Sequence, residues 1–174
     1  MEGRVDAKWS RMSIPGRRNR NKIDGQFAPR TVEMLRSYPY RVLSQSAHRV
    51  LARIEIEFAD HGGTDNGKLP ITYADFIDYG LDRHAIGPAI DECEALGFIE
   101  VTERGRSGNA EFRKPNLFRL TYRYTERAAP TNEWRRINTR EEAIAIALAA
   151  RKSSIRRSRR KRVQRQGEPL RAVG

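Results

Sequence analysis

This 174-residue chain is short of cysteine and of long hydrophobic runs, and these shortages remove whole classes of protein. Its single cysteine, Cys93, excludes an internal disulfide and is typical of a reducing compartment. No apolar stretch reaches the roughly 20 residues that span a bilayer, and the N-terminus lacks the apolar core of a signal peptide. We therefore expect a cytoplasmic protein that makes no contact with a membrane.

The patterns of catalytic and metal-binding sites are also missing. The three histidines and Cys93 show no metal-ligand spacing, and the sequence has no Gly-x-Ser-x-Gly motif or phosphate-binding loop. Cys93 falls among the apolar positions of a predicted helix, where a buried small hydrophobe explains it better than a nucleophile does. We expect neither an enzyme nor a bound cofactor.

Basic residues are abundant, and they are concentrated at the two ends of the chain, which carries a formal net charge of +12. Residues 1–30 hold eight Lys/Arg against three acids, and residues 151–174 hold ten against one. Residues 31–150 hold sixteen against eighteen. No amphipathic apolar face or lipidation motif accompanies the basic ends, so a nucleic acid is a better partner for them than a membrane.

The stretch 71–122 has the order helix, turn, helix and hairpin that is typical of a winged helix-turn-helix. Thr72 and Asp75 have the spacing of a capping box for the first helix. Asp82 can cap the second helix. One face of that second helix is predicted to point inward, and it carries Ile86, Ile90, Cys93 and Leu96.

A proline departs from the usual pattern of the second helix. Gly87-Pro88 falls where the helix should be well under way, and a proline beyond the first turn removes a hydrogen bond. Either the helix starts later, with Gly87 as N-cap and Pro88 in the first position, or it is kinked there. We favour the later start.

The hairpin and the elements before it complete the predicted domain. Strands at 98–102 and 117–122 enclose a polar loop, and the second strand alternates inward and outward residues as far as Arg123. Ser44 or Ser46 can cap a long amphipathic helix. The short segment 68–71 is predicted to pair with the hairpin as a third strand.

We therefore expect an α+β, mainly α protein whose chain has five parts. They are a basic flexible arm (1–25), a winged helix-turn-helix domain (26–127), a linker (128–138), an Ala-rich helix (139–152) and a basic disordered tail (153–174).

Two features of the last segments make further predictions. Trp134 in the linker folds back onto the core. The Ala-rich helix carries a stripe of Ile144, Ala147 and Leu148, which can extend to Arg151 and which docks on the domain or on a second subunit. We favour docking on the domain, and a homodimer is the alternative.

Three segments also resemble a known group of proteins. Residues 26–51, 66–71 and 89–99 look like the winged-helix proteins of bacterial plasmids and phages that are associated with replication initiation. The resemblance covers about residues 26–124. It implies a winged-helix fold and a role as a replication-initiation factor or, because the Leu-Gly-Phe-Ile signature occurs in many winged-helix families, as a regulator of transcription.

The candidate DNA contacts are the basic residues that the core leaves outside. Arg83 and His84, at the start of the second helix, can donate to phosphate or to guanine edges. The acids Asp91, Glu92 and Glu94 farther along would be repelled by phosphate. Basic residues of the hairpin and tail complete the predicted interface: Arg104, Arg106, Arg113, Lys114, Arg119, Arg156, Arg157, Arg159, Arg160, Lys161 and Arg162.

Two functions remain open at this point. The first is a nucleoid-associated, double-stranded DNA-binding protein that regulates transcription or initiates replication of a mobile element. The second is a winged-helix module that binds proteins in a replisome or ribonucleoprotein complex, while its basic tails bind nucleic acid non-specifically. The basic hairpin favours the first function, and the acids of the second helix favour the other.

Overall fold

The computed structural model describes residues 24–28, 30–105 and 114–167. Within these ranges the chain is α+β and mainly helical, with one small antiparallel sheet, as the sequence predicts. The elements in chain order are α1 (Val32–Arg36), α2 (Tyr38–Val42), α3 (Gln45–Asp60), β1 (Leu69–Ile71), α4 (Tyr73–Asp78), α5 (Arg83–Ala95), β2 (Ile99–Glu103), β3 (Asn116–Leu120), η2 (Glu133–Arg136) and α6 (Arg140–Gly167).

Two predicted helix starts are confirmed by their caps, and a third helix begins at a capping residue that the sequence also offers. Ser44 accepts a hydrogen bond from the backbone N–H of Ala47 and begins α3. Thr72 and Asp75 form the capping box of α4, with the Thr72 backbone N–H donating to the Asp75 carboxylate at 2.7 Å. Asp82 caps α5, and all four residues predicted on its inner face are buried: Ile86, Ile90, Cys93 and Leu96.

The sheet has the strand order β1-β3-β2, and β1 pairs antiparallel with β3 as predicted. The predicted alternation of the second hairpin strand is wrong after Leu120, where β3 ends. Thr121 points inward and is buried, because its hydroxyl donates to the carbonyl oxygen of Gly97 at 2.7 Å. This bond ties the end of the sheet to the turn that follows α5.

The predicted linker 128–138 folds onto the core, as expected for Trp134. The Trp134 indole is buried and stacks on Phe98 with ring centroids 6.4 Å apart. Gly97 lies beside it with φ +79, and an added Cβ would approach the Trp134 backbone nitrogen to 2.6 Å. Only glycine fits at this position.

The start of α5 corrects the sequence analysis, because the helix begins at Arg83 and not at Pro88. The Asp82 carboxylate accepts from the His84 backbone N–H at 2.8 Å and fixes the earlier start. Pro88 is tolerated inside the helix because Gly87, the residue before it, has no Cβ to clash with the proline ring. Arg83 and His84 therefore belong to a formed helical turn.

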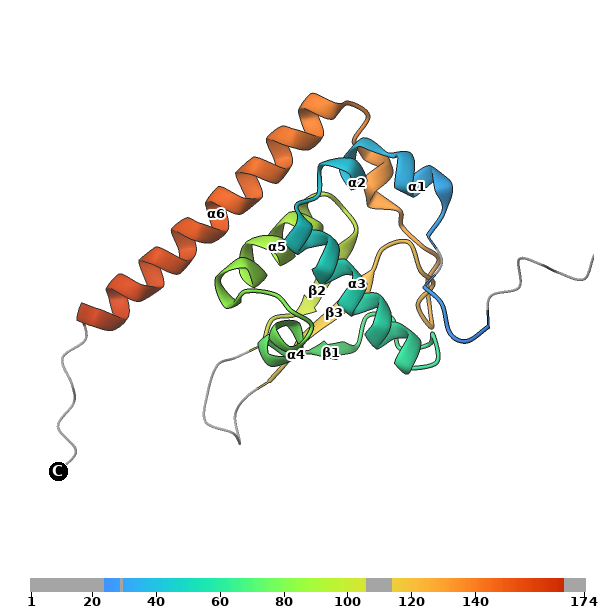
Figure 1. Cartoon of the computed structure of the whole chain (residues 1–174), viewed down its shortest axis with the longest axis horizontal. Helices are drawn as coiled ribbons and strands as arrows, with labels where there is room; N and C mark the ends of the chain where they lie inside the picture. The colour runs from blue at the N-terminus through green and yellow to red at the C-terminus, as the bar shows by residue number, and fades with distance from the viewer. Residues whose placement is uncertain (1–23, 29, 106–113, 168–174) are drawn as a thin grey trace, which may run out of the picture.

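The C-terminal helix also differs from the prediction. α6 is one helix from Arg140 to Gly167, so the predicted boundary at residue 152 and the predicted disorder of 153–167 are corrected. The cause is twofold. Arginine, lysine and glutamine are good helix formers, and α6 continues to contact α5 well beyond residue 152. Figure 1 shows its C-terminal half extending past the rest of the domain.

Docking of α6 on the domain is confirmed, and Ala147 of the predicted stripe lies at the contact, but Ile144 and Leu148 do not. The buried residues are Ala143, Ala147 and Ser154, whereas Ile144 and Leu148 are exposed. Small side chains allow the backbones of α5 and α6 to approach closely, which a stripe of isoleucine and leucine would prevent. The larger apolar residues are left on the surface of the helix.

Candidate nucleic-acid interface

The body of α5 is covered on two sides, by α3 and by α6. Arg83 and His84 in its first turn are exposed, as predicted. Gly87 and Asp91 lie against α6. A Cβ at Gly87 would lie 3.5 Å from the Ser154 hydroxyl, and the Asp91 side chain keeps only 11% of its exposure. Only the first turn of α5 is therefore free to enter a groove of DNA.

Glu92 is a buried carboxylate that joins three helices. It accepts hydrogen bonds from the backbone N–H of Ser44 at 2.9 Å and from the Ser44 hydroxyl at 2.8 Å. The Arg151 guanidinium of α6 pairs with it at 2.8 Å. Since Ser44 is also the N-cap of α3, one acid of α5 holds both neighbouring helices.

The other two acids of α5 are paired as well. Arg104, just after β2, lies 2.6 Å from the Glu94 carboxylate and 3.8 Å from that of Asp91. Arg157 of α6 pairs with Asp91 from the other side. The acids that were expected to repel phosphate are thus engaged with arginines, which removes the sequence argument against a DNA-binding surface here.

Arg104 and Arg157, from different elements, both pair with Asp91, and Arg83 lies exposed in the first turn of α5. We call Arg83, Arg104 and Arg157 the arginine junction. Tyr73 of α4 lies close enough to Asp91, Arg104 and Arg83 for their charges to act on its phenol. Burial raises the pKa of the Tyr73 phenol, the charge of Asp91 raises it further, and the charges of Arg104 and Arg83 act in the opposite direction. The side chains of Arg104 and Arg157 remain 58% and 56% exposed while paired, so both keep donors directed to solvent.

The basic half of α6 extends this surface. Lys152, Arg156 and Arg160 are exposed, and their spacing of four residues places them on one face of the helix. Three other predicted contacts lie on the helical backbone of α6, but their side chains are outside the part of the chain that the structure describes: Arg159, Lys161 and Arg162.

The hairpin contributes less than predicted. Lys114 is 71% exposed and lies 3.7 Å from Glu103. The Arg119 guanidinium is occupied, since it pairs with Glu100 at 2.7 Å and donates to the Thr131 hydroxyl at 2.7 Å. Two more predicted contacts fall in the hairpin loop outside the described residues: Arg106 and Arg113.

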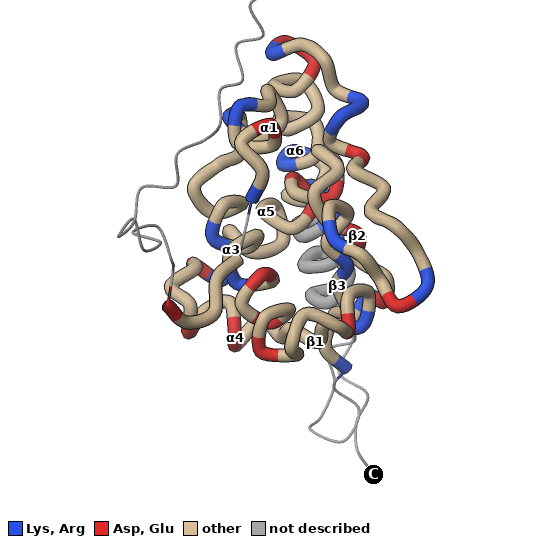
Figure 2. The backbone as a smooth tube through the Cα atoms, turned by 90° about the vertical axis from the view of Figure 1, so that its right-hand side faces the viewer, with Lys and Arg blue, Asp and Glu red and all other residues tan. Residues whose placement is uncertain are grey.

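The helix before α5 offers no cation. α4 has the sequence Tyr-Ala-Asp-Phe-Ile-Asp, and Figure 2 shows the acidic positions around it in red. In a helix-turn-helix the first helix usually crosses the phosphate backbone. The two carboxylates of α4, on Asp75 and Asp78, oppose that contact, so the basic surface is formed by the first turn of α5, the base of the hairpin and α6.

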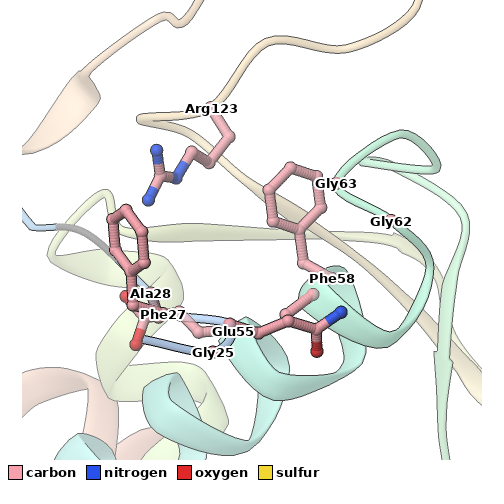
Figure 3. Close-up of a pocket in the computed structure, with 10 residues that line it drawn as sticks. Gly25, Phe27, Ala28, Glu55, Phe58, Gly62, Gly63 and Arg123 are labelled. Atoms are coloured by element: carbon pink, nitrogen blue, oxygen red, sulfur yellow. The ribbon is translucent and has the colours of Figure 1, made fainter. Parts of the chain in front are cut away.

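A cavity of about 290 Å³ lies at the C-terminal end of α3. Figure 3 shows the Arg123 side chain reaching over the rings of Phe27 and Phe58. The Glu55 carboxylate in its wall is engaged by Arg30 and accepts from the Tyr122 hydroxyl at 2.7 Å. The residues that line the cavity include no histidine, cysteine or serine, and we assign no reaction to it.

Metal clusters and membrane-spanning helices are both absent from the described ranges 24–28, 30–105 and 114–167. No group of three His, Cys, Asp or Glu side chains there is arranged to hold a metal ion. None of the helices in these ranges combines the length and apolar character needed to cross a bilayer. Comparison of the chain with protein-family models, with curated proteins and with solved structures finds no match.

Proposed function

We propose that this chain is a double-stranded DNA-binding protein with a winged helix-turn-helix domain. The succession α3, β1, α4, α5, β2 and β3, with the sheet order β1-β3-β2, supports this fold assignment. The duplex is bound by the arginine junction and by the basic face of α6. α5 contributes its first turn and does not enter a groove along its length.

The observation that carries this proposal is the arginine junction. Arg104 of the hairpin and Arg157 of α6 meet at Asp91, and the carboxylates of Asp91 and Glu94 are already paired. Guanidinium groups with exposed donors bind phosphate oxygens in a fixed geometry. Arg83 and His84, in the exposed turn beside them, are the residues placed to contact base edges.

The biological role follows the earlier resemblance and stays a prediction. Binding of this kind suits a regulator of transcription or a replication-initiation factor of a mobile element, and it would associate the protein with the nucleoid. The junction predicts sequence-independent affinity, because phosphate contacts position a protein without reading the bases.

A test of the proposal compares two paired arginine sites. The double variant Arg104→Ala/Arg157→Ala removes two junction arginines, and Arg135→Ala removes an arginine that pairs with Glu33 at 2.7 Å and is 51% exposed. Fluorescence anisotropy with a random duplex should show about tenfold or greater weakening for the double variant, or about 1.4 kcal/mol or more. Arg135→Ala should bind like the parent. Equal affinity of all three proteins would refute the interface.

A second candidate function is a protein-interaction module whose basic ends alone bind nucleic acid. It is favoured by the cover of α6 over α5 and by the acidic α4. In that case the double variant retains its duplex affinity, and binding is lost only when the lysines and arginines of residues 1–23 and 159–171 are neutralised.

A further inference from the structure

One face of α6 carries large apolar side chains that nothing in the described structure covers. Ile144, Leu148 and Ile155 are 37%, 43% and 45% exposed. Their spacing of four and then seven residues keeps them on one line along the helix. This exposed stripe lies beside the docking face formed by the small residues of α6, so docking on α5 leaves it free.

The stripe continues onto the neighbouring helix α2. Tyr38 is 41% exposed, and it forms a shallow depression together with Ile144. The remaining walls of this depression are Arg41, Val42 and Arg140. The surface therefore offers both projecting side chains and a recess of about 270 Å³.

We propose that the exposed stripe is a homodimer interface, in which α6 pairs antiparallel with α6 of a second copy of this chain. Ile144 then faces Ile155 of the second copy, and Leu148 lies near the two-fold axis. By symmetry each copy supplies one recess beside Tyr38 and one Ile155 side chain to occupy the recess of the other. This proposal depends on the surface of α6 and not on the proposed DNA binding.

The charges of α6 are complementary to those of a second α6 that runs antiparallel to it. Glu141 and Glu142 lie in the first turn, whereas from Arg151 to Gly167 the helix contains basic residues and no acids. The antiparallel register places Glu141 opposite the turn of the second helix at residues 157–160. A parallel pair would instead put the two basic halves side by side, where they repel.

The size of the interface predicts a weak dimer. A single helix pair with three large apolar side chains per copy buries less than the roughly 1,200–2,000 Å² of a stable interface. We therefore expect dimerisation that depends on protein concentration. Monomer should predominate in dilute solution and dimer in concentrated solution.

Sedimentation equilibrium of the full chain tests the interface. The parent protein should show a mass that rises from one chain to two with concentration, and Leu148→Asp should remain a monomer. Ile56→Asp is the matched control, because Ile56 of α3 is 39% exposed but lies away from α6. The control should dimerise like the parent. Thermal melting monitored by circular dichroism verifies that both variants fold.

Cysteine cross-linking tests the direction of the pair. Residues 144 and 155 of one helix are about 16 Å apart, too far for a disulfide within a copy. Cys93 is fully buried and does not compete. Under oxidation Ile144→Cys/Ile155→Cys should form a covalent dimer, whereas either single variant should not.

Two results would overturn the proposal. A parent protein that stays monomeric at all concentrations would exclude a second copy as the occupant and assign the stripe to a different protein. Cross-linking of Ile144→Cys alone would show a parallel pair and would refute the antiparallel arrangement.

Discussion

α5 and α6 pack against each other, yet the acids of α5 are paired whereas many basic residues of α6 are exposed to solvent. The acids of α5 all have partners: Asp91 and Glu94 pair with arginines, and Glu92 is buried with Ser44 and Arg151. The exposed basic residues of α6 extend along a free face of the helix. The charge of a sequence segment therefore does not predict the charge on its surface, because pairing within the fold can neutralise it.

The difference comes from where each helix lies. α5 is enclosed by α3 and α6, and a buried carboxylate is stable only when it is paired and hydrogen-bonded. α6 is attached along one face and extends beyond the domain (Figure 1), so its exposed cations Lys152, Arg156 and Arg160 keep their hydration.

The largest expected effect comes from the enclosed face of α5. Ile90 is 4% exposed, and Ile90→Ala should lower the free energy of unfolding by about 2–5 kcal/mol because it leaves a cavity in the core. Urea unfolding of the variant and the parent measures the change. A variant that unfolds like the parent would mean that the inner face of α5 is assigned incorrectly.

Removing the cation that faces Glu92 should be the next most damaging change. Arg151→Ala leaves the Glu92 carboxylate buried with only Ser44 as a partner, and we expect a loss of about 2–4 kcal/mol, reduced because Arg151 is partly exposed. The double variant Glu92→Gln/Arg151→Ala should recover part of that loss, since its buried group carries no charge. A loss in the double variant equal to the sum of the losses of Arg151→Ala and Glu92→Gln would contradict a direct interaction.

The close approach of α6 to α5 can be opened with a larger side chain. Ala147 is 1% exposed at the contact, and Ala147→Leu should cost about 1–3 kcal/mol through overpacking. Ala149→Leu is the matched control, because Ala149 is exposed two residues farther along the same helix. Thermal melting should be lowered by the first change only. Equal melting temperatures would show that α6 does not dock through its small residues.

The smallest expected effect concerns pH. Burial lowers the pKa of His48 below its ordinary value of 6.5, the charge of Arg30 lowers it further, and that of Glu92 opposes them. The unfolded chain therefore binds the proton more readily, so stability should fall as pH drops through 6.5 toward the folded pKa. His48→Gln should flatten the pH dependence in urea unfolding, and an unchanged slope would contradict this assignment.

Local patterns in the sequence predicted local structure well. The capping pair Thr72–Asp75 and the inner face of α5 depend on residues three or four apart, where the geometry of a helix fixes the contact. The start of α5 was mispredicted because the penalty of Pro88 was weighed without the relief that Gly87 provides. The sequence did contain a signal for Glu92, since it lies three residues after Ala89 and four before Leu96, on the buried side of the helix.

Contacts between distant segments were not predictable in the same way. Arg151–Glu92 and Arg157–Asp91 join residues 59 and 66 positions apart, and no periodicity encodes such pairs. The docking face of α6 was assigned to its largest apolar residues, but close helix packing selected alanine and serine. The Arg157–Asp91 pair belongs to the arginine junction, so the interface is visible only in the folded chain.

Salt dependence of duplex binding tests the arginine junction most directly. Each phosphate contact that is lost should flatten the plot of log K against log salt by about 0.9. We predict that Arg83→Ala/Arg104→Ala/Arg157→Ala, measured beside Arg135→Ala on a random duplex, reduces the slope by about 2–3, whereas the control keeps the parent's slope. A triple variant with the parent's slope and affinity would show that these arginines do not contact DNA and would contradict the proposed interface.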